Sequence, residues 1–399
     1  MSRRLAVQAA AVYLALRAVT AVFIAISARH QVPVTGWTGP NPGYLDMTVL
    51  WDGSWYRSIA EHGYPPYVPI VNGVVQQNAL AFYPLFPLLA RLGMEATGLG
   101  FPAVASTLAL LLGLGAAILM AGILAERMPR RGGAVALAAV AVWAAFPSAV
   151  SLQLAYTESL AMLLLCGFLW AVLRREWWVA GLVALAMGLT RPIAVPLGAV
   201  LLVALWLRWR HRRKHPIETG EIGSAAVGLA GCGVGAMLWP ALTWAMTGSR
   251  TAYAETMAAW RPSHVLVPFR PWWDMAGWVF RDTAHPGVYG PIALLAVVAT
   301  LLVAVLGPWA AGLGWELRSW CLAYPAYLGA VLDPFTSIFR YLLPLFPLTL
   351  VMIGAGWSDR RVSRWWLVRA GVLVALGVLG QVWWIRGLLV YVPPSDYPP

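Results

Sequence analysis

The sequence predicts an all-α integral membrane protein, built as a polytopic helical bundle. Of its 399 residues, 60% are hydrophobic and only 11% are charged, and the mean hydropathy is +0.70. Soluble domains usually carry about a quarter of their residues as charges, so this composition excludes an ordinary soluble enzyme and a disordered chain. The apolar residues also gather into about eleven runs, many of them near the roughly 20 residues that cross a bilayer.

These apolar runs define the expected transmembrane spans. The first run, 5–28, is longer than the apolar core of about 7–15 residues in a cleaved signal peptide, so we expect it to remain as a span. Two short runs are expected to turn at Thr190-Arg191-Pro192, because arginines flank the pair on both sides and mark both of its ends as cytoplasmic. The expected spans are 5–28, 101–125, 134–150, 153–173, 177–190, 193–207, 222–247, 288–306, 316–332, 338–356 and 366–386.

The net charge of +12 indicates a topology rather than a nucleic-acid partner. Arg3, Arg4 and the basic run 208–214 fall in segments expected on the cytoplasmic side, where positive residues concentrate. We therefore expect a cytoplasmic N-terminus, contact with membrane lipids and no nucleic acid. Residues 1–399 form one polytopic domain, and its two long loops, 29–100 and 248–287, are expected outside. These loops are the segments large enough for extramembrane chemistry.

A short amphipathic helix is expected in the first outer loop. Asp52 is a suitable N-cap, and Gly63 is a suitable stop signal. Between them, Trp55, Ile59 and His62 share one face, which predicts a helix lying in the membrane interface. Two interpretations stay open from the pattern alone. Asp52 has a chemical role, or it only caps a helix that serves as an anchor.

Several motifs of this loop resemble the PIG-V family of GPI mannosyltransferases. Trp51-Asp52, Ile59-Ala60-Glu61-His62-Gly63-Tyr64 and Phe82-Tyr83-Pro84-Leu85-Phe86-Pro87-Leu88 are similar to that family's WD, IAEHGY and FFPxxPL elements. Tyr156-Thr157-Glu158-Ser159-Leu160 resembles its (S/T)ESL element, and Arg340-Tyr341-Leu342-Leu343-Pro344 resembles a run of its bacterial relatives. The match is dense in the first loop and thin beyond residue 200. The arginine-rich composition, with a single lysine, is typical of a bacterial, actinobacterial-type member.

The resemblance implies a GT-C-type helical glycosyltransferase in the bacterial plasma membrane, with its active site on the outer face. It implies an inverting reaction, a polyprenyl-phosphate donor with mannose as the expected sugar, and Asp52 as the catalytic acidic residue of the first loop. The acceptor would be a lipid-linked or cell-envelope glycan. We expect no cofactor and no metal, since neither the three cysteines nor the six histidines show the spacing of a metal site.

The chemistry of sugar transfer assigns further residues. A base must take the proton of the acceptor hydroxyl, and a phosphate leaves readily once its charge is stabilised, so one carboxylate suffices. Asp52 fits this role, with Asp46 as its rival. Arginines would hold the phosphate. Arg340 is the first candidate and Arg191 the second, unless both only reach towards lipid headgroups. The remaining expected substrate contacts are His62, Trp51, Tyr56, Glu158 and Tyr341.

Three other functions stay open at this point. A transporter or lipid flippase would also have many apolar spans, although such proteins tend to show internal repeats and polar residues in mid-membrane. Here we find no repeat, and Arg17 is the one charge that we place inside a span. An enzyme of the same fold that uses another polyprenyl-phosphate sugar, such as arabinose or glucose, is the second alternative. A non-catalytic accessory subunit is the third.

Overall fold

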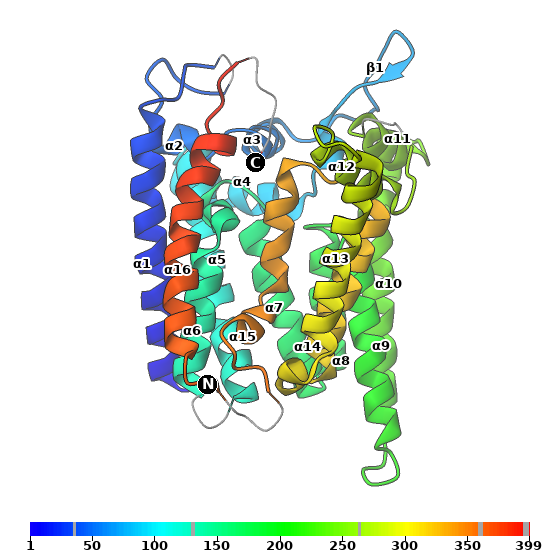
Figure 1. The fold of residues 1–399 in the computed structure, drawn as a ribbon. Helices are drawn as coiled ribbons and strands as arrows, with labels where there is room; N and C mark the ends of the chain where they lie inside the picture. The colour runs from blue at the N-terminus through cyan, green and yellow to red at the C-terminus, as the bar shows by residue number, and fades with distance from the viewer. Residues whose placement is uncertain (35–36, 129–131, 262–264, 358–361, 394–398) are drawn as a thin grey trace.

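The computed structural model confirms an almost entirely helical protein (Figure 1). It describes residues 1–34, 37–128, 132–261, 265–357, 362–393 and 399. Within these residues, the only strands are the two-residue β1 (Ile70–Val71) and β2 (Val74–Val75), which pair antiparallel across a tight turn in the first loop. All other regular structure is helical, as the composition predicts.

One set of helices forms the bundle, and a second set gathers at one of its ends (Figure 1). The helices of the bundle are α1 (Arg3–Ala28), α5 (Phe101–Arg127), α6 (Gly132–Ala145), α7 (Glu158–Arg174), α8 (Trp177–Gly188), α9 (Ala194–Arg210), α10 (Thr219–Thr247), α13 (Pro286–Leu306), α14 (Gly314–Val331), α15 (Leu348–Met352) and α16 (Trp366–Trp384). Those at its end are α2 (Tyr44–Met47), α3 (Asp52–His62), α4 (Leu85–Thr97), α11 (Ala252–Ala259) and α12 (Arg270–Val279). The 3₁₀-helices are η1 (Ala79–Ala81), η2 (Pro147–Gln153), η3 (Pro308–Leu313) and η4 (Thr336–Leu345), and η5 (Ile385–Leu389) is a π-helix.

The two long loops meet at the same end of the bundle, which we call the loop end. It carries α2 and α3 from the first loop and α11 and α12 from the second (Figure 1). The basic connection between α9 and α10 projects from the opposite end. The arginine-rich segment and the loops expected outside therefore lie at opposite ends, as the charge pattern predicts.

The expected spans differ in how completely they form single helices. Among the described residues, α1, α5, α10, α13 and α16 continued through η5 are long and apolar enough to cross a membrane; α6 and η2, which meet at a bend of 86°, would make a sixth such span. The prediction of a continuous span at 338–356 is wrong. That region is the ten-residue η4 and the five-residue α15, because Pro344 and Pro347 lack the N–H that a helix interior needs.

Glycines hold the short helix α8 against α10. A Cβ atom at Gly188 would lie 2.1 Å from the carbonyl oxygen of Gly235, and one at Gly231 would lie 2.5 Å from that of Gly181. Only glycine permits backbones to approach this closely in a helix pair. The contact fixes the C-terminal end of α8 and therefore the predicted turn at Thr190-Arg191-Pro192, which the structure confirms between α8 and α9.

A buried arginine supports the sharp bend between α6 and η2. Arg17 of α1 is 2% exposed, and its guanidinium donates to the carbonyl oxygens of Ala144 and Ala149 on the two sides of the bend. Gln381 of α16 donates to Ala144 as well, at 3.2 Å. Backbone groups that a helix break releases in an apolar setting need such partners. Arg17 thus stabilises η2 in the position from which the chain enters α7.

Candidate active site

The first-loop helix α3 forms as expected but begins differently. It has eleven residues, and it ends at Gly63, whose φ is +83° and whose N–H donates to Ile59 at 2.8 Å. The predicted pair of Arg57 and Glu61 is present, with 2.9 Å between Nε and Oε1. The prediction that Asp52 is the N-cap is wrong, because Trp51 occupies that position and Asp52 is the first helical residue.

Trp51 is anchored on the side of the chain away from Asp52. Its indole is 8% exposed, donates to the carbonyl oxygen of Leu389 at 3.0 Å and packs edge-on against Trp37 and Tyr391. Trp51 has a φ of +57°, in a region that a bulky residue rarely adopts and that costs energy. This strained turn lets the indole and the Asp52 carboxylate point to different sides.

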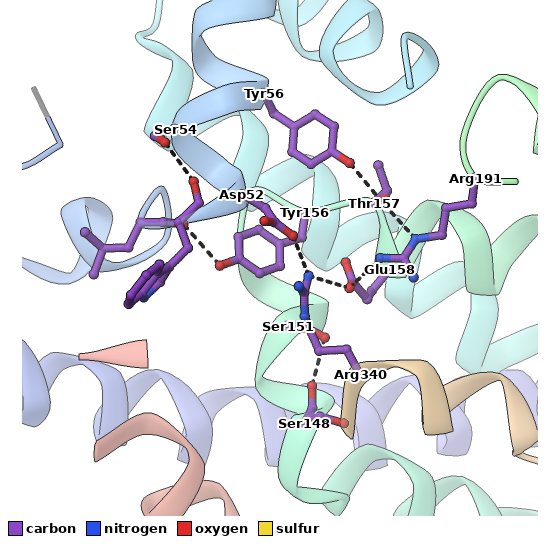
Figure 2. Close-up of polar contacts among 12 residues, drawn as sticks. Asp52, Ser54, Tyr56, Ser148, Ser151, Tyr156, Thr157, Glu158, Arg191 and Arg340 are labelled. Carbon is purple, nitrogen blue, oxygen red and sulfur yellow. Dashed lines mark hydrogen bonds and ion pairs between the residues drawn. The ribbon is translucent and has the colours of Figure 1, made fainter. Parts of the chain in front are cut away.

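The Asp52 carboxylate meets Arg340, from the distant η4 segment. Nη1 of Arg340 donates to Asp52 Oδ2 at 2.8 Å and to Glu158 Oε1 at 3.0 Å (Figure 2). The Arg340 side chain is 4% exposed and that of Glu158 is 2% exposed, whereas that of Asp52 is 28% exposed. One guanidinium therefore pairs with two carboxylates, and of these three side chains only that of Asp52 is partly exposed to solvent.

Arg191 contacts the carboxylate of Glu158 from the turn between α8 and α9. Its Nη2 lies 2.5 Å from Glu158 Oε1, and its Nε donates to Thr157 Oγ1 at 2.9 Å (Figure 2). The guanidinium also lies over the ring of Tyr341, 5.3 Å from its centre. Burial opposes the charge on Arg191, but the neighbouring Glu158 raises its pKa above the ordinary value. We therefore take Arg191 as a permanent cation of the site.

Two tyrosines complete the polar cluster. The hydroxyl of Tyr56 donates to Thr157 Oγ1 at 3.5 Å, and that of Tyr156 donates to the carbonyl oxygen of Leu50 at 3.1 Å. Arg340 lies over the ring of Tyr156, 5.0 Å from its centre. Burial and the nearby charge of Asp52 raise the pKa of Tyr56. Tyr56 is therefore a proton donor in hydrogen bonds at neutral pH.

Two atoms of the cluster keep unused hydrogen-bonding capacity. Nε of Arg340 and Oε2 of Glu158 are buried and have no hydrogen-bond partner among the residues that the structure describes. Buried polar atoms in folded proteins are nearly always paired. A donor and an acceptor left over beside a partly exposed carboxylate are the features of a site that binds a polar ligand.

The structure brings together six of the eight residues predicted from the sequence. These are Asp52, Tyr56, Glu158, Arg191, Arg340 and Tyr341. Trp51 lies apart, as described above, and so does His62, which is exposed at the C-terminal end of α3. His62 lines a separate polar cavity of about 450 Å³ with Trp37, Ser54, Arg57 and Glu61, among others.

The sequence left Asp46 open as an alternative base and did not predict that Tyr156 and Thr157 would contact the arginines. The carboxylate of Asp46 accepts from the backbone N–H of Gly43 at 2.8 Å and so organises α2 instead of joining the cluster. Thr157 and Tyr156 were recognised only as part of a motif, although both contact arginines of the site. Their place directly before Glu158 was the available signal.

The described residues contain no group of three or more His, Cys, Asp or Glu side chains that could hold a metal ion. The cluster instead has two carboxylates and two guanidinium groups, so its formal charge is balanced. Arginine can neutralise a phosphate without a metal, through paired N–H donors. A partly exposed carboxylate beside such arginines combines a possible base with an anion site.

Comparison with known proteins identifies the fold. No family model matches the chain, and no curated protein matches it. One similar solved structure is that of ArnT from Cupriavidus metallidurans bound to undecaprenyl phosphate, with a TM-score of 0.50 and 16% sequence identity. The similarity covers 92% of this chain and 64% of ArnT, so the chain spans less than two thirds of that protein. The chain is therefore a polytopic helical membrane protein with the GT-C fold.

Proposed function

We propose that this protein is a membrane glycosyltransferase that moves mannose, with inversion, from a polyprenyl phosphate to a lipid-linked or cell-envelope glycan. The observation that carries the proposal is the contact of Arg340 with both Asp52 and Glu158 at the loop end of the bundle. The fold supports the proposal, because the similar ArnT structure contains undecaprenyl phosphate. The choice of mannose rests on the resemblance of the first-loop motifs to PIG-V enzymes.

Asp52 acts as the base in this proposal. Its carboxylate takes the proton of the acceptor hydroxyl while the hydroxyl oxygen bonds to the anomeric carbon of the donor sugar. The bond from that carbon to the phosphate oxygen breaks, and polyprenyl phosphate leaves with the electron pair. Asp52 is suited to this role because its side chain is 28% exposed, whereas Glu158 is 2% exposed and already accepts from two arginines.

Arg340 and Arg191 hold the phosphate. Nε of Arg340 has no partner among the described residues, and the contact of Nη1 with Asp52 can be exchanged for a phosphate oxygen when the donor binds. This exchange would release Asp52 to accept a proton from the acceptor. Glu158 keeps both guanidinium groups oriented through one oxygen, while Tyr56 and Tyr341 line the same cluster.

The proposed orientation places the loop end outside the plasma membrane and the N-terminus in the cytoplasm. The basic connection between α9 and α10 lies at the other end of the bundle, where positive residues would face the cytoplasm (Figure 1). A donor with a polyprenyl tail would then enter from the membrane and present its phosphate at the level of the cluster.

The test uses purified protein, undecaprenyl-phosphate mannose and a lipid extract of bacterial membranes. Wild type is compared with Asp52→Asn, and donor consumption is followed together with labelled product. The expected result is transfer by wild type and its near absence in Asp52→Asn. Undecaprenyl-phosphate glucose and arabinose are run in parallel.

Each outcome decides a different part of the proposal. Transfer of glucose or arabinose but not mannose would keep the glycosyltransferase and overturn the choice of sugar. Equal transfer by both proteins would remove Asp52 from the role of base. Consumption of none of the three donors by wild type would overturn the proposed function.

A further inference from the structure

Outside the cluster, Asp333 carries two buried carboxylate oxygens that have no hydrogen-bond partner in the described parts of the chain. Asp333 lies between α14 and η4, a few residues before Arg340, and its side chain is half-buried. Both of its carboxylate oxygens are nevertheless screened from solvent, and neither has a hydrogen-bond partner among the described residues. Burying a carboxylate in this way is costly unless another molecule supplies the hydrogen bonds.

Two donor side chains follow each other at the end of α11, and one of them contacts the segment that carries Asp333. Arg261 follows α11, and its Nη2 donates to the carbonyl oxygen of Val331 at 3.3 Å, which holds the guanidinium against the segment that carries Asp333. The charge of Arg261 acts on Asp333 and partly offsets the effect of burial, which raises the pKa of that carboxyl. The preceding residue, Trp260, has a buried indole N–H with no partner among the described residues.

An aromatic wall connects these groups to the proposed base. Trp260 packs edge-on against Trp55 of α3 at 5.6 Å between ring centres, and against Phe82 at 5.5 Å. Trp55 also stacks on Phe82. Because residues three apart share a face of a helix, Trp55 lies on the same side of α3 as Asp52. The unpaired indole thus borders the side of α3 that carries the base, and Arg261, the next residue, connects it to the segment that carries Asp333.

We propose that Asp333, Arg261 and Trp260 form a subsite for the hydroxyl groups of a sugar. A carboxylate accepts from hydroxyls, an indole and a guanidinium donate to them, and a sugar hydroxyl can do both. Aromatic rings supply the apolar surface on which the C–H groups of a sugar ring pack. This inference rests on the proposed function. The sugar is either that of the donor or that of the acceptor glycan, and the test separates the two.

The test compares wild type, Asp333→Asn and Trp260→Phe in three assays. The assays are binding of undecaprenyl phosphate, transfer with varied undecaprenyl-phosphate mannose, and transfer with varied membrane lipid extract. Asp282→Asn is the matched control, since that second-loop side chain is 86% exposed. Trp260→Phe keeps an aromatic ring and removes the indole N–H with the pyrrole part of the ring, so it tests the donor of the subsite independently of the charge at Asp333.

The expected result is a loss of sugar recognition without a loss of phosphate recognition. Asp333→Asn should raise the half-saturating amount of one sugar substrate about 10-fold, the effect of losing hydrogen bonds to a charged group. Trp260→Phe should raise the same amount about 3-fold, and both should leave kcat within about 3-fold. A shift for the donor assigns the subsite to the donor sugar, and a shift for the extract assigns it to the acceptor.

Other results would overturn the inference. If both variants match wild type and Asp282→Asn in every assay, there is no sugar subsite at Asp333. If binding of undecaprenyl phosphate weakens as much as that of the sugar donor, the group acts on the phosphate. If wild type neither binds undecaprenyl phosphate nor transfers sugar, the proposed function itself has failed, and the subsite fails with it.

Discussion

Nη1 of Arg340 lies 2.8 Å from Oδ2 of Asp52, although 288 positions separate the two residues in the chain. The contact joins the first-loop helix α3 to η4, and Glu158 at the start of α7 joins them through the same guanidinium nitrogen. With Arg191, which contacts Glu158 from the turn between α8 and α9, four segments that are distant in sequence thus meet in one charge-balanced cluster. A bundle that only spans a membrane has no need for this arrangement, because burying such charges is costly.

Replacing Asp52 by asparagine should lower the rate of sugar transfer by about 10²- to 10⁴-fold, the usual contribution of a general base. Asparagine retains an oxygen that can accept from Arg340, so we expect the protein to stay folded and to bind the donor. Single-turnover transfer measures the rate, and donor titration measures the binding. Asp46→Asn serves as the control, since the bonds of Asp46 to described residues come from backbone N–H groups of its own segment. Transfer by Asp52→Asn within threefold of wild type would contradict the assignment.

Arg340→Met should destabilise the protein by about 3 kcal/mol, because Asp52 and Glu158 lose their shared cation. Adding Asp52→Asn to this variant should recover part of the loss, since one uncompensated charge disappears. Thermal unfolding in detergent of the single and double variants gives this coupling as a double-mutant cycle. Strict additivity of the two changes would show that the ion pair contributes no stability.

Arg340→Lys should retain most of the stability and lose donor affinity by about 10-fold, because an ammonium group lacks the planar fork that binds phosphate oxygens in pairs. The measurement is the half-saturating donor concentration, with the acceptor held constant. Arg57→Lys is a matched control on α3, where the arginine pairs only with Glu61 in the part of the chain that the structure describes. An unchanged donor requirement in Arg340→Lys would argue against phosphate binding by Arg340.

Much of this fold and part of the site can be predicted from the sequence. Composition and apolar runs predict the helical membrane bundle. Pro344 and Pro347 argue against one continuous helix over 338–356, but α10 and α14 continue through Pro240 and Pro325, so proline alone does not decide the outcome. The location of Trp51 was not predictable, because its partners Trp37 and Tyr391 come from opposite ends of the chain. The pairing of Arg340 with Asp52 likewise depends on helix packing, which no local pattern encodes.

Asp333 shows a different limit of sequence reasoning. An Asp-Pro pair at the end of a helix is typical of an ordinary turn, so Asp333 gave no signal of its own. Only the packing around it shows that its oxygens are buried and unpaired. His62 illustrates the reverse, since its motif attracted attention and the structure places it away from the cluster.

The stability of the protein should depend on pH through Asp333. Burial raises the pKa of its carboxyl above the ordinary value of 3.8, so the folded state disfavours the ionised form. The stability that this group contributes is therefore complete below pH 3.8 and is lost as the pH rises through the folded-state pKa. Asp333→Asn should be more stable than wild type at neutral pH, and the gain should shrink as the pH falls towards 4. Unfolding midpoints of both proteins from pH 4 to 8 test this, and a gain that does not vary with pH would contradict it.

The bend between α6 and η2 should depend on Arg17. Arg17→Leu leaves the carbonyl oxygens of Ala144 and Ala149 without their charged donor, and we expect a loss of about 3 kcal/mol in unfolding free energy, given about 1.5–3 kcal/mol for each such bond. Arg17→Lys should recover part of this loss, because an ammonium group can still donate to one of the two oxygens. Arg4→Leu on the exposed start of the same helix is the control.

Ser148 of η2 donates to the carbonyl oxygen of Phe339 at 2.6 Å, next to Arg340, so Arg17→Leu should also weaken donor binding. Normal donor binding in a destabilised Arg17→Leu protein would show that the bend supports the fold and not the position of Arg340.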